Sequence, residues 1–299
     1  MNASPLSAQG LGKRFRREWS LRGLTLEIPQ GAVVGLAGPN AAGKSTLLAL
    51  ATGLLAPTEG TISVLGRDPL RDAGLLADVG YIAQGAPLYR SFTVAETIEY
   101  ARRTNTRWDS GPAVDLLTSI PARTKVGSLS EGERARLALA LVLGKRPQLV
   151  LLDEPFASLD PLAGRELLQL LMDGVAETGA TVVVASHVVA DIERVCDHIV
   201  LLAGGAVRLE GNVEALLESH RLLTGPRRPL GGIHGVREIV RERHSGRQLT
   251  LLTVVDGPVV DPSWTVEPVS LEELLLAYMA PERVPTPRIT EKVPLRWHG

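Results

Sequence analysis

The chain has very little cysteine: Cys196 is the only one among its 299 residues. An intrachain disulfide is therefore excluded, and a reducing compartment is expected. The chain also has no excess of charge of either sign, since 32 Lys and Arg residues nearly balance 33 Asp and Glu residues, which gives a net charge of −1. Because proteins that bind nucleic acid by bulk electrostatics are strongly basic, no nucleic acid is expected as a partner.

Long hydrophobic runs are absent as well. No uncharged apolar stretch reaches the ~18 residues that a membrane-spanning helix needs, and Met1–Leu6 lacks the basic-then-apolar order of a signal peptide. We therefore expect this chain to have no membrane span, so that any crossing would be supplied by another chain. The composition, 44% hydrophobic and 22% charged, leaves room for one large globular domain and one small one.

One segment present in the chain has the pattern of a phosphate-binding loop. Residues 38–45 read Gly-Pro-Asn-Ala-Ala-Gly-Lys-Ser, between an apolar run (Ala32–Ala37) and a helix-forming stretch from Thr46. Glycines let successive N–H groups point at phosphates, and a helix N-terminus favours anions. Lys44 can then reach the β- and γ-phosphates, and the Ser45 hydroxyl can bind Mg²⁺. The strand–loop–helix context disfavours the alternative of an ordinary turn.

Two adjacent carboxylates follow a second apolar strand, Leu149–Leu152. Asp153 at the strand end can hold Mg²⁺, and Glu154 can accept a proton from water aimed at the γ-phosphate. Gln84 and His187 also follow apolar strands, where an amide can reach Mg²⁺ and an imidazole can bond a terminal phosphate. Taken singly, these last two residues are weak signals, since both types are common for structural reasons.

A second anion-binding position is predicted at the segment Leu129–Glu133. Ser130 and Gly132 stand where a long amphipathic helix begins, and a helix N-terminus attracts anions. One chain already has a phosphate loop, so a second such position suggests a site that is completed by another subunit.

The arrangement of the chain predicts an α/β fold. Apolar strand candidates alternate with helical patterns up to residue 220, and several are continuous Val, Leu and Ile runs typical of buried parallel strands. The predicted strands are Leu24–Ile28, Val33–Ala37, Thr61–Val64, Val79–Ile82, Leu149–Leu152, Thr181–Ala185, Ile199–Leu202 and Val207–Leu209.

Five segments follow from this pattern. We predict a nucleotide-binding domain over 1–222 with a helical insertion at about 90–146, where strands are absent. A Gly- and Pro-rich linker over 223–232 and a small accessory domain over 233–280 follow, the latter with a strand at Leu249–Val255 and a helix capped by Ser270. The Pro-rich segment 281–299 is predicted to be a disordered tail.

Taken together, the motifs resemble those of the nucleotide-binding subunits of ABC transporters over about residues 6–220. In that family's terms they are the Walker A loop (Gly38–Ser45), Q-loop (Gln84), signature (Leu129–Glu133), Walker B strand with its glutamate (Leu149–Glu154), D-loop (Ser158–Asp160) and switch histidine (His187). The resemblance implies a P-loop NTPase core of the RecA-like type, with an antiparallel β edge, the helical insertion and a small C-terminal α+β extension.

The resemblance also implies an ATP and Mg²⁺ site. Phe15 is expected to stack on adenine, with Trp19 as the alternative. Catalytic roles fall to Glu154, His187 and Gln84, and Mg²⁺ ligands to Ser45, Gln84 and Asp153. The expected nucleotide-binding residues are Phe15, Gly38, Pro39, Asn40, Ala41, Ala42, Gly43, Lys44, Ser45, Thr46, Ser130, Gly132 and Asp160.

Within the family, segments Gly53–Gly60 and Leu88–Val94 and the C-terminal extension resemble ABC-2 type drug and antibiotic exporters. This implies an ATPase that dimerises on ATP with a second nucleotide-binding subunit and drives a separate transmembrane permease at the cytoplasmic face of the cell membrane. The alternatives are a soluble ABC-type ATPase acting on ribosomes or DNA, disfavoured by chain length and charge, and a regulator that binds ATP without hydrolysing it, disfavoured because Glu154 and His187 are present.

The sequence departs from the family pattern at three positions. Ala41 replaces a common glycine in the phosphate loop, Glu131 a glycine of the signature, and Glu133 its glutamine. A carboxylate at 131 either opposes the γ-phosphate of a partner subunit's ATP or points to solvent at a helix start, where negative charge is favourable.

Overall fold

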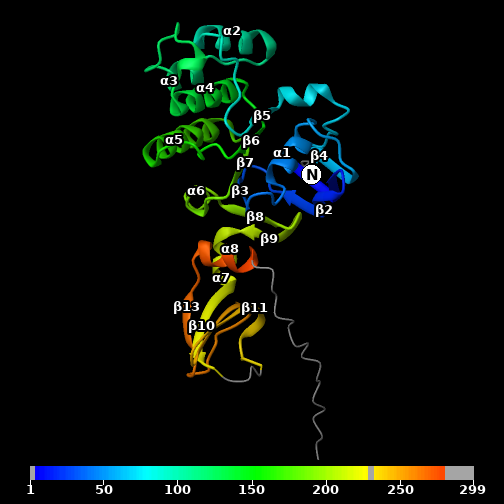
Figure 1. Ribbon diagram of the computed structural model, residues 1–299, viewed down its shortest axis with the longest axis vertical. Helices are drawn as coiled ribbons and strands as arrows, with labels where there is room; N and C mark the ends of the chain where they lie inside the picture. The colour runs from blue at the N-terminus through cyan, green and yellow to red at the C-terminus, as the bar shows by residue number, and fades with distance from the viewer. Residues whose placement is uncertain (1–3, 228–231, 280–299) are drawn as a thin grey trace, which may run out of the picture. The chain divides into compact units, whose positions relative to one another are not determined.

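The computed structural model describes residues 4–227 and 232–279. The chain divides into two compact units, Met1–Val213 and Glu214–Gly299 (Figure 1). The first unit carries every motif described above, and the second corresponds to the C-terminal extension.

The first unit is built around a six-stranded sheet with the order β5-β6-β7-β3-β8-β9. All neighbouring strands are parallel except the β8–β9 pair. The strands are β5 (Val79–Ile82), β6 (Leu149–Asp153), β7 (Thr181–Ser186), β3 (Val33–Ala37), β8 (His198–Ala203) and β9 (Ala206–Asn212). The central strands β3, β6 and β7 are buried along their whole length, which explains their uninterrupted apolar sequences.

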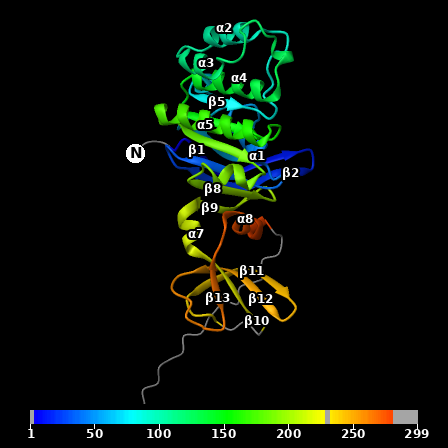
Figure 2. The same ribbon diagram turned by 90° about the vertical axis from the view of Figure 1, so that its left-hand side faces the viewer.

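A second, antiparallel sheet has the order β2-β1-β4, formed by β1 (Leu6–Phe15), β2 (Glu18–Ile28) and β4 (Glu59–Val64). Its buried side chains and those of helix α1 (Lys44–Ala51) belong to the same hydrophobic cluster as β3 and β6. Figure 2 shows this sheet and the parallel one in the same unit. The expectation of a mixed core with an antiparallel edge is confirmed.

Helices take over between β5 and β6, as predicted. The insertion contains α2 (Val94–Thr104), α3 (Gly111–Leu116) and α4 (Glu131–Gly144), together with the short 3₁₀ turn Val126–Ser128; another such turn, Ala73–Ala77, precedes β5. Two further helices follow β6 and β7, α5 (Pro161–Thr178) and α6 (Val189–Glu193). Helix α4 begins directly after Ser130, which places the signature segment at its N-terminus.

The second unit holds a four-stranded antiparallel sheet with the order β11-β12-β10-β13 and two helices. Its elements are α7 (Val213–Ser219), β10 (His220–Pro226), β11 (Val236–Ser245), β12 (Gln248–Val255), β13 (Thr265–Pro268) and α8 (Leu271–Met279). Leu223, Leu249, Leu251 and Trp264 form its apolar core. The predicted strand over Leu249–Val255 and the Ser270 cap of the last helix are both present.

The structure differs from three sequence predictions. Leu223–Pro226 belong to strand β10, not to a linker, because Leu223 supplies a core side chain that pairs with Leu251 on β12. The two units meet at 213–214 instead of 222–223. Strands β1, β10, β11 and β13 had not been predicted. The proposed tail at 281–299 lies outside the described residues, and no helix of the described part is long and apolar enough to cross a bilayer.

Candidate nucleotide site

The predicted motifs meet because parallel strands end at one edge of the sheet. Ala37 pairs with Ser186, and Asp153 with Ala185, so the phosphate loop and the segments beginning at Glu154 and His187 leave the sheet side by side. A backbone hydrogen bond of 2.9 Å from Glu154 N to Ala185 O continues the β6–β7 pairing by one residue, to Glu154. Ligand sites of α/β sheets form at such carboxyl ends.

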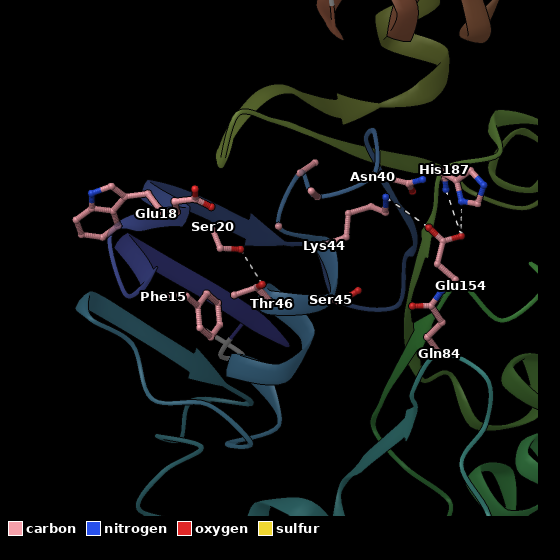
Figure 3. A pocket seen from close by; sticks show the side chains of 14 residues that line it. Phe15, Glu18, Ser20, Asn40, Lys44, Ser45, Thr46, Gln84, Glu154 and His187 are labelled. Carbon is pink, nitrogen blue, oxygen red and sulfur yellow. Dashed lines mark hydrogen bonds and ion pairs between the residues drawn. The ribbon is translucent and has the colours of Figure 1, made fainter.

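A cavity of about 530 Å³ opens at this edge. It gathers side chains from the β1–β2 hairpin, the phosphate loop, the end of β5, and the segments after β6 and β7 (Figure 3). Of the sequence-predicted residues, it is lined by Phe15, Asn40, Ala41, Ala42, Gly43, Lys44, Ser45, Thr46, Gln84, Glu154 and His187.

Two glycines of the phosphate loop are required by its shape. Gly38 and Gly43 have φ angles of 153° and 105°, and a Cβ atom would lie 2.3 Å from Leu202 O and 2.4 Å from Leu21 Cδ2 respectively. Ala41 also has a positive φ, 62°, which an alanine adopts only with strain. A glycine at position 41 would be free of that strain, so Ala41 makes the loop somewhat less stable.

Lys44 is at the centre of a chain of charged contacts. Its Nζ donates to the carbonyls of Gly38 (2.7 Å) and Pro39 (3.3 Å) and lies 3.4 Å from Glu154 Oε1. Glu154 Oε2 is 2.8 Å from His187 Nδ1 (Figure 3). The side chains of Lys44 and Glu154 are 6% and 8% exposed, so solvent screens this pair weakly.

Asp153 and Ser45 provide oxygen ligands suited to Mg²⁺. Ser45 Oγ donates to Asp153 Oδ1 at 3.0 Å, and Asp153 is 3% exposed. Burial raises the pKa of Asp153, the charge of Glu154 adds to this, and the Ser45 hydrogen bond opposes it. No three His, Cys, Asp or Glu side chains converge as a metal site within the described residues. Mg²⁺ needs only one or two carboxylates, because water and substrate phosphates complete its shell.

The end of the cavity that is formed by the β1–β2 hairpin carries two aromatic side chains, Phe15 and Trp19. Phe15 is 46% exposed. The guanidinium groups of Arg14 and Arg22 lie 5.4 and 5.9 Å from the Trp19 ring centroid, whereas Phe15 has one cation, that of Lys13, at 5.2 Å. This leaves Phe15 the better candidate for stacking on a base.

Phe15→Ala is expected to weaken binding of ATP by about 1–3 kcal/mol, the range seen when an aromatic platform for a base is removed. Trp19→Ala is expected to leave that affinity within about twofold. Fluorescence titration of both variants with a nucleotide analogue measures the difference. A loss of affinity confined to Trp19→Ala would assign the stacking role to Trp19.

The signature residues lie in a different hollow of the same chain. It is lined by Ser130, Gly132 and Asp160 together with Glu131 and Glu133, and none of these five lines the cavity of the phosphate loop. The structure therefore does not bring them to the nucleotide cavity within one chain.

Glu133 has a defined structural role at the start of α4. Its Oε2 accepts from Ser130 N and Ser130 Oγ, both at 2.8 Å, and its own N–H donates to Ser130 Oγ, which completes a capping box. These hydrogen bonds hold the pKa of Glu133 below its usual range. Asp160 likewise caps α5 through Leu162 N and Ala163 N.

Sequence reasoning missed two polar residues of the cavity, Glu18 and Ser20. Ser20 Oγ and Thr46 Oγ1 are 2.8 Å apart, which joins β2 to the first turn of α1. The available signal was their spacing: residues two apart on a strand share a face, and both follow Phe15.

Comparison with known proteins supports the same kind of site. The family model described as "ABC transporter" matches residues 21–157. The Nod factor export ATP-binding protein I of Rhizobium sp. (strain N33) is 34% identical over 229 residues, covering 74% of this chain and 75% of that protein. The sulfate/thiosulfate import ATP-binding protein CysA 2 of Rhizobium meliloti is 31% identical over 221 residues, covering 70% of this chain and 60% of that protein.

Among solved structures, the dimeric post-hydrolysis state of the ATP-binding cassette MJ0796, bound to ADP and Pi, aligns with a TM-score of 0.62 and 27% identity. The alignment covers 70% of this chain and 98% of that chain. It confirms the predicted P-loop NTPase core.

Proposed function

Since this chain belongs to the family of ABC transporter ATP-binding proteins, and is an ABC-type ATPase, we propose that it hydrolyses ATP at the Lys44–Glu154 cavity to drive export through a separate permease. The observation that carries this proposal is the convergence of Phe15, the phosphate loop, Gln84, Glu154 and His187 on one cavity.

In this proposal each residue has one task. The loop amides and Lys44 bind the phosphates, and Phe15 supports the base. Ser45, Asp153 and Gln84 would hold Mg²⁺, which would offset charge on the phosphates. Glu154 accepts the proton of the attacking water. His187, 2.8 Å from Glu154, orients that carboxylate and can bond the γ-phosphate.

The proposed active form is a dimer with two-fold symmetry. Ser130 and Gly132 lie in a hollow apart from the phosphate loop of their own chain, and a two-fold axis would place them over the loop of a second copy. The dimeric structure of the related cassette supports this arrangement.

The charge at Glu131 bears on that dimer. Glu131 is exposed at the first position of α4. Arg136 pairs with Glu166, and Arg134 donates to Leu129 O, so neither neighbouring arginine forms an ion pair with Glu131 in the described part of the chain. A carboxylate here opposes an approaching phosphate.

Glu131→Gln, in a chain that also carries Glu154→Gln, is expected to strengthen ATP-driven dimerisation about three- to tenfold at low salt, because a small repulsion is removed at both copies of the interface. The gain should shrink as salt rises. Sedimentation at two salt concentrations measures it, with Glu272→Gln in the first turn of α8 as the control. Equal dimer affinity with and without the substitution would leave Glu131 as a helix-start residue only.

The permease is proposed to dock near Gln84–Tyr89. Three aromatic rings gather beside this segment: Tyr89 and Phe92 are 5.2 Å apart between centroids, and Tyr100 packs edge-on against both at 6.2 and 6.3 Å. Tyr89 and Tyr100 are 63% and 51% exposed. Exposed apolar patches of this kind mark protein interaction sites.

Membrane retention tests the proposed partner. Co-expression with a candidate permease, a membrane protein sought among the reading frames next to that of this chain, is expected to hold the ATPase in the membrane fraction, and Tyr89→Ala with Tyr100→Ala to release it. Val114→Ala, at an equally exposed apolar position on α3, is the control and should stay bound. Recovery with ribosomes or DNA instead of membranes would favour the soluble alternative.

The relatives include both export and import proteins. The proposal that this chain drives export therefore depends on more detailed similarities. The Nod factor export protein aligns over three quarters of its own length, and the Gly53–Gly60 and Leu88–Val94 segments are similar to those of the exporter branch. Cells that carry the inactive Glu154→Gln subunit should accumulate the transported compound. Reduced cellular content of that compound would indicate import.

A further inference from the structure

Glu18 is the charged side chain of the nucleotide cavity that none of the roles above uses. It lines the cavity together with Phe15 and the phosphate loop. It is also the only acid among residues 13–22, which otherwise carry five cationic side chains. A carboxylate beside a triphosphate site is unfavourable unless cations or hydrogen-bond donors face it, and a nucleotide offers such donors at its sugar and its base.

The position of Glu18 along the strand fixes which part of the nucleotide it can meet. Glu18 pairs with Phe15 across the β1–β2 ladder, at the proposed base end. Ser20, two residues further along β2, is bonded to Thr46 at the start of α1, the phosphate end. Residues two apart share a strand face and lie roughly 7 Å from each other. Glu18 therefore stands level with Phe15, one step along the strand from the phosphate end.

Figure 3 shows the same order: Phe15, Glu18 and Ser20 occupy one end of the cavity, and Gln84, Glu154 and His187 the other, with Lys44 between them. In a nucleotide whose base lies on Phe15 and whose phosphates lie on the loop, the sugar begins next to the ring, within reach of the Glu18 side chain paired with Phe15. The sugar of ATP presents two neighbouring hydroxyl groups, and a carboxylate has two oxygens that accept from such a pair.

From this geometry we propose that Glu18 accepts hydrogen bonds from the ribose 2′- and 3′-hydroxyls and makes the site selective for ribonucleotides over deoxyribonucleotides. The proposal rests on the ATP site proposed above and adds a specificity-determining residue to it. A carboxylate is tolerated at the sugar because the ribose hydroxyls offer donors and carry no charge, unlike the phosphates.

The test compares ligands that differ by one hydroxyl. Calorimetric titration of the full chain with ADP, 2′-deoxy-ADP and 3′-deoxy-ADP avoids hydrolysis. The wild-type chain is expected to bind ADP on the order of tenfold more tightly than either deoxy ligand, because each hydrogen bond to a charged acceptor is lost with its hydroxyl. Glu18→Ala is expected to weaken ADP by the loss of both hydrogen bonds, on the order of a hundredfold, and each deoxy ligand by the loss of the one that it keeps, about tenfold, so that the selectivity disappears.

Two controls separate the sugar contact from other effects. Glu27→Ala removes an exposed carboxylate from the same strand outside the cavity and should leave all three affinities unchanged. Inosine diphosphate, which lacks the exocyclic amine of adenine but keeps the ribose, should respond to Glu18→Ala as ADP does.

Three results would overturn the assignment. Equal affinity of the wild-type chain for ADP and the deoxy ligands excludes a ribose contact. If Glu18→Ala changes the affinity for all ligands equally, the role of Glu18 is reduced to its charge. If the affinity falls for ADP but not for inosine diphosphate, the contact is with the base. Failure of the wild-type chain to bind any of these nucleotides would instead reject the ATP site itself, and the Glu18 contact with it.

Discussion

Glu154→Gln is expected to lower the rate of ATP hydrolysis about 10²- to 10⁴-fold, the usual contribution of a general base. An amide cannot accept the proton of the attacking water, yet it keeps the shape of the side chain. Glu154 is suited to this task because its carboxylate is 8% exposed and is held between Lys44 and His187. ATP binding should be retained, and ATP should then trap the dimer.

Phosphate release under saturating ATP measures this loss, and equilibrium titration shows that ATP still binds. Glu193→Gln, on the exposed face of α6, is the matched control and should hydrolyse ATP at the wild-type rate. The substitution removes the counter-ion of a buried lysine, so a thermal melt of each variant is needed to show that the chain is folded. Turnover of Glu154→Gln within a few-fold of the wild type would place the base elsewhere.

Lys44→Ala is expected to weaken ATP binding by two orders of magnitude or more. The ammonium group is the cation of the phosphate loop, and hydrogen bonds between charged groups contribute about 1.5–3 kcal/mol each. Its place in the loop is fixed by the carbonyls of Gly38 and Pro39, so no other side chain of the loop can take over the charge.

The matched control for Lys44→Ala is Lys125→Ala, which removes an exposed cation of the insertion and should leave ATP affinity unchanged. Removing one partner of a buried ion pair destabilises a fold by a few kcal/mol. Lys44→Met, which restores most of the lost volume, therefore serves as a second variant and should show the same loss of affinity. A nucleotide dissociation constant within about threefold of the wild type in folded variants would reject the phosphate-loop assignment.

The order of the motifs was predictable from the sequence because each one is local. Strands β3, β6 and β7 are buried on both faces, so their sequences are continuous apolar runs that stand out in any window. The residues that follow them are then expected at a single edge of the sheet. The Ser130–Glu133 capping box of α4 is equally local, since both partners lie within one turn.

Other elements gave no such signal. Strand β1 contains Gly10, Gly12 and the basic residues from Lys13, and its pairing is interrupted by bulges, so no alternating pattern runs along it. All four residues of β13 are exposed, and the strand is defined only by its hydrogen bonds to β10. Pro226 and Gly225 looked like a linker, but Gly225 is needed because a Cβ there would meet the Trp264 ring at 2.7 Å.

The phosphate loop, the two acids at a strand end and the helix-start signature can be recognised in the amino-acid sequence alone, because each depends on neighbouring residues. The folded chain was needed to show that Lys44 meets Glu154, that Ser20 joins Thr46, and that Ser130 lies in a separate hollow. These contacts bridge residues far apart in the chain. They depend on strand order and register, and no local pattern of side chains encodes either of these.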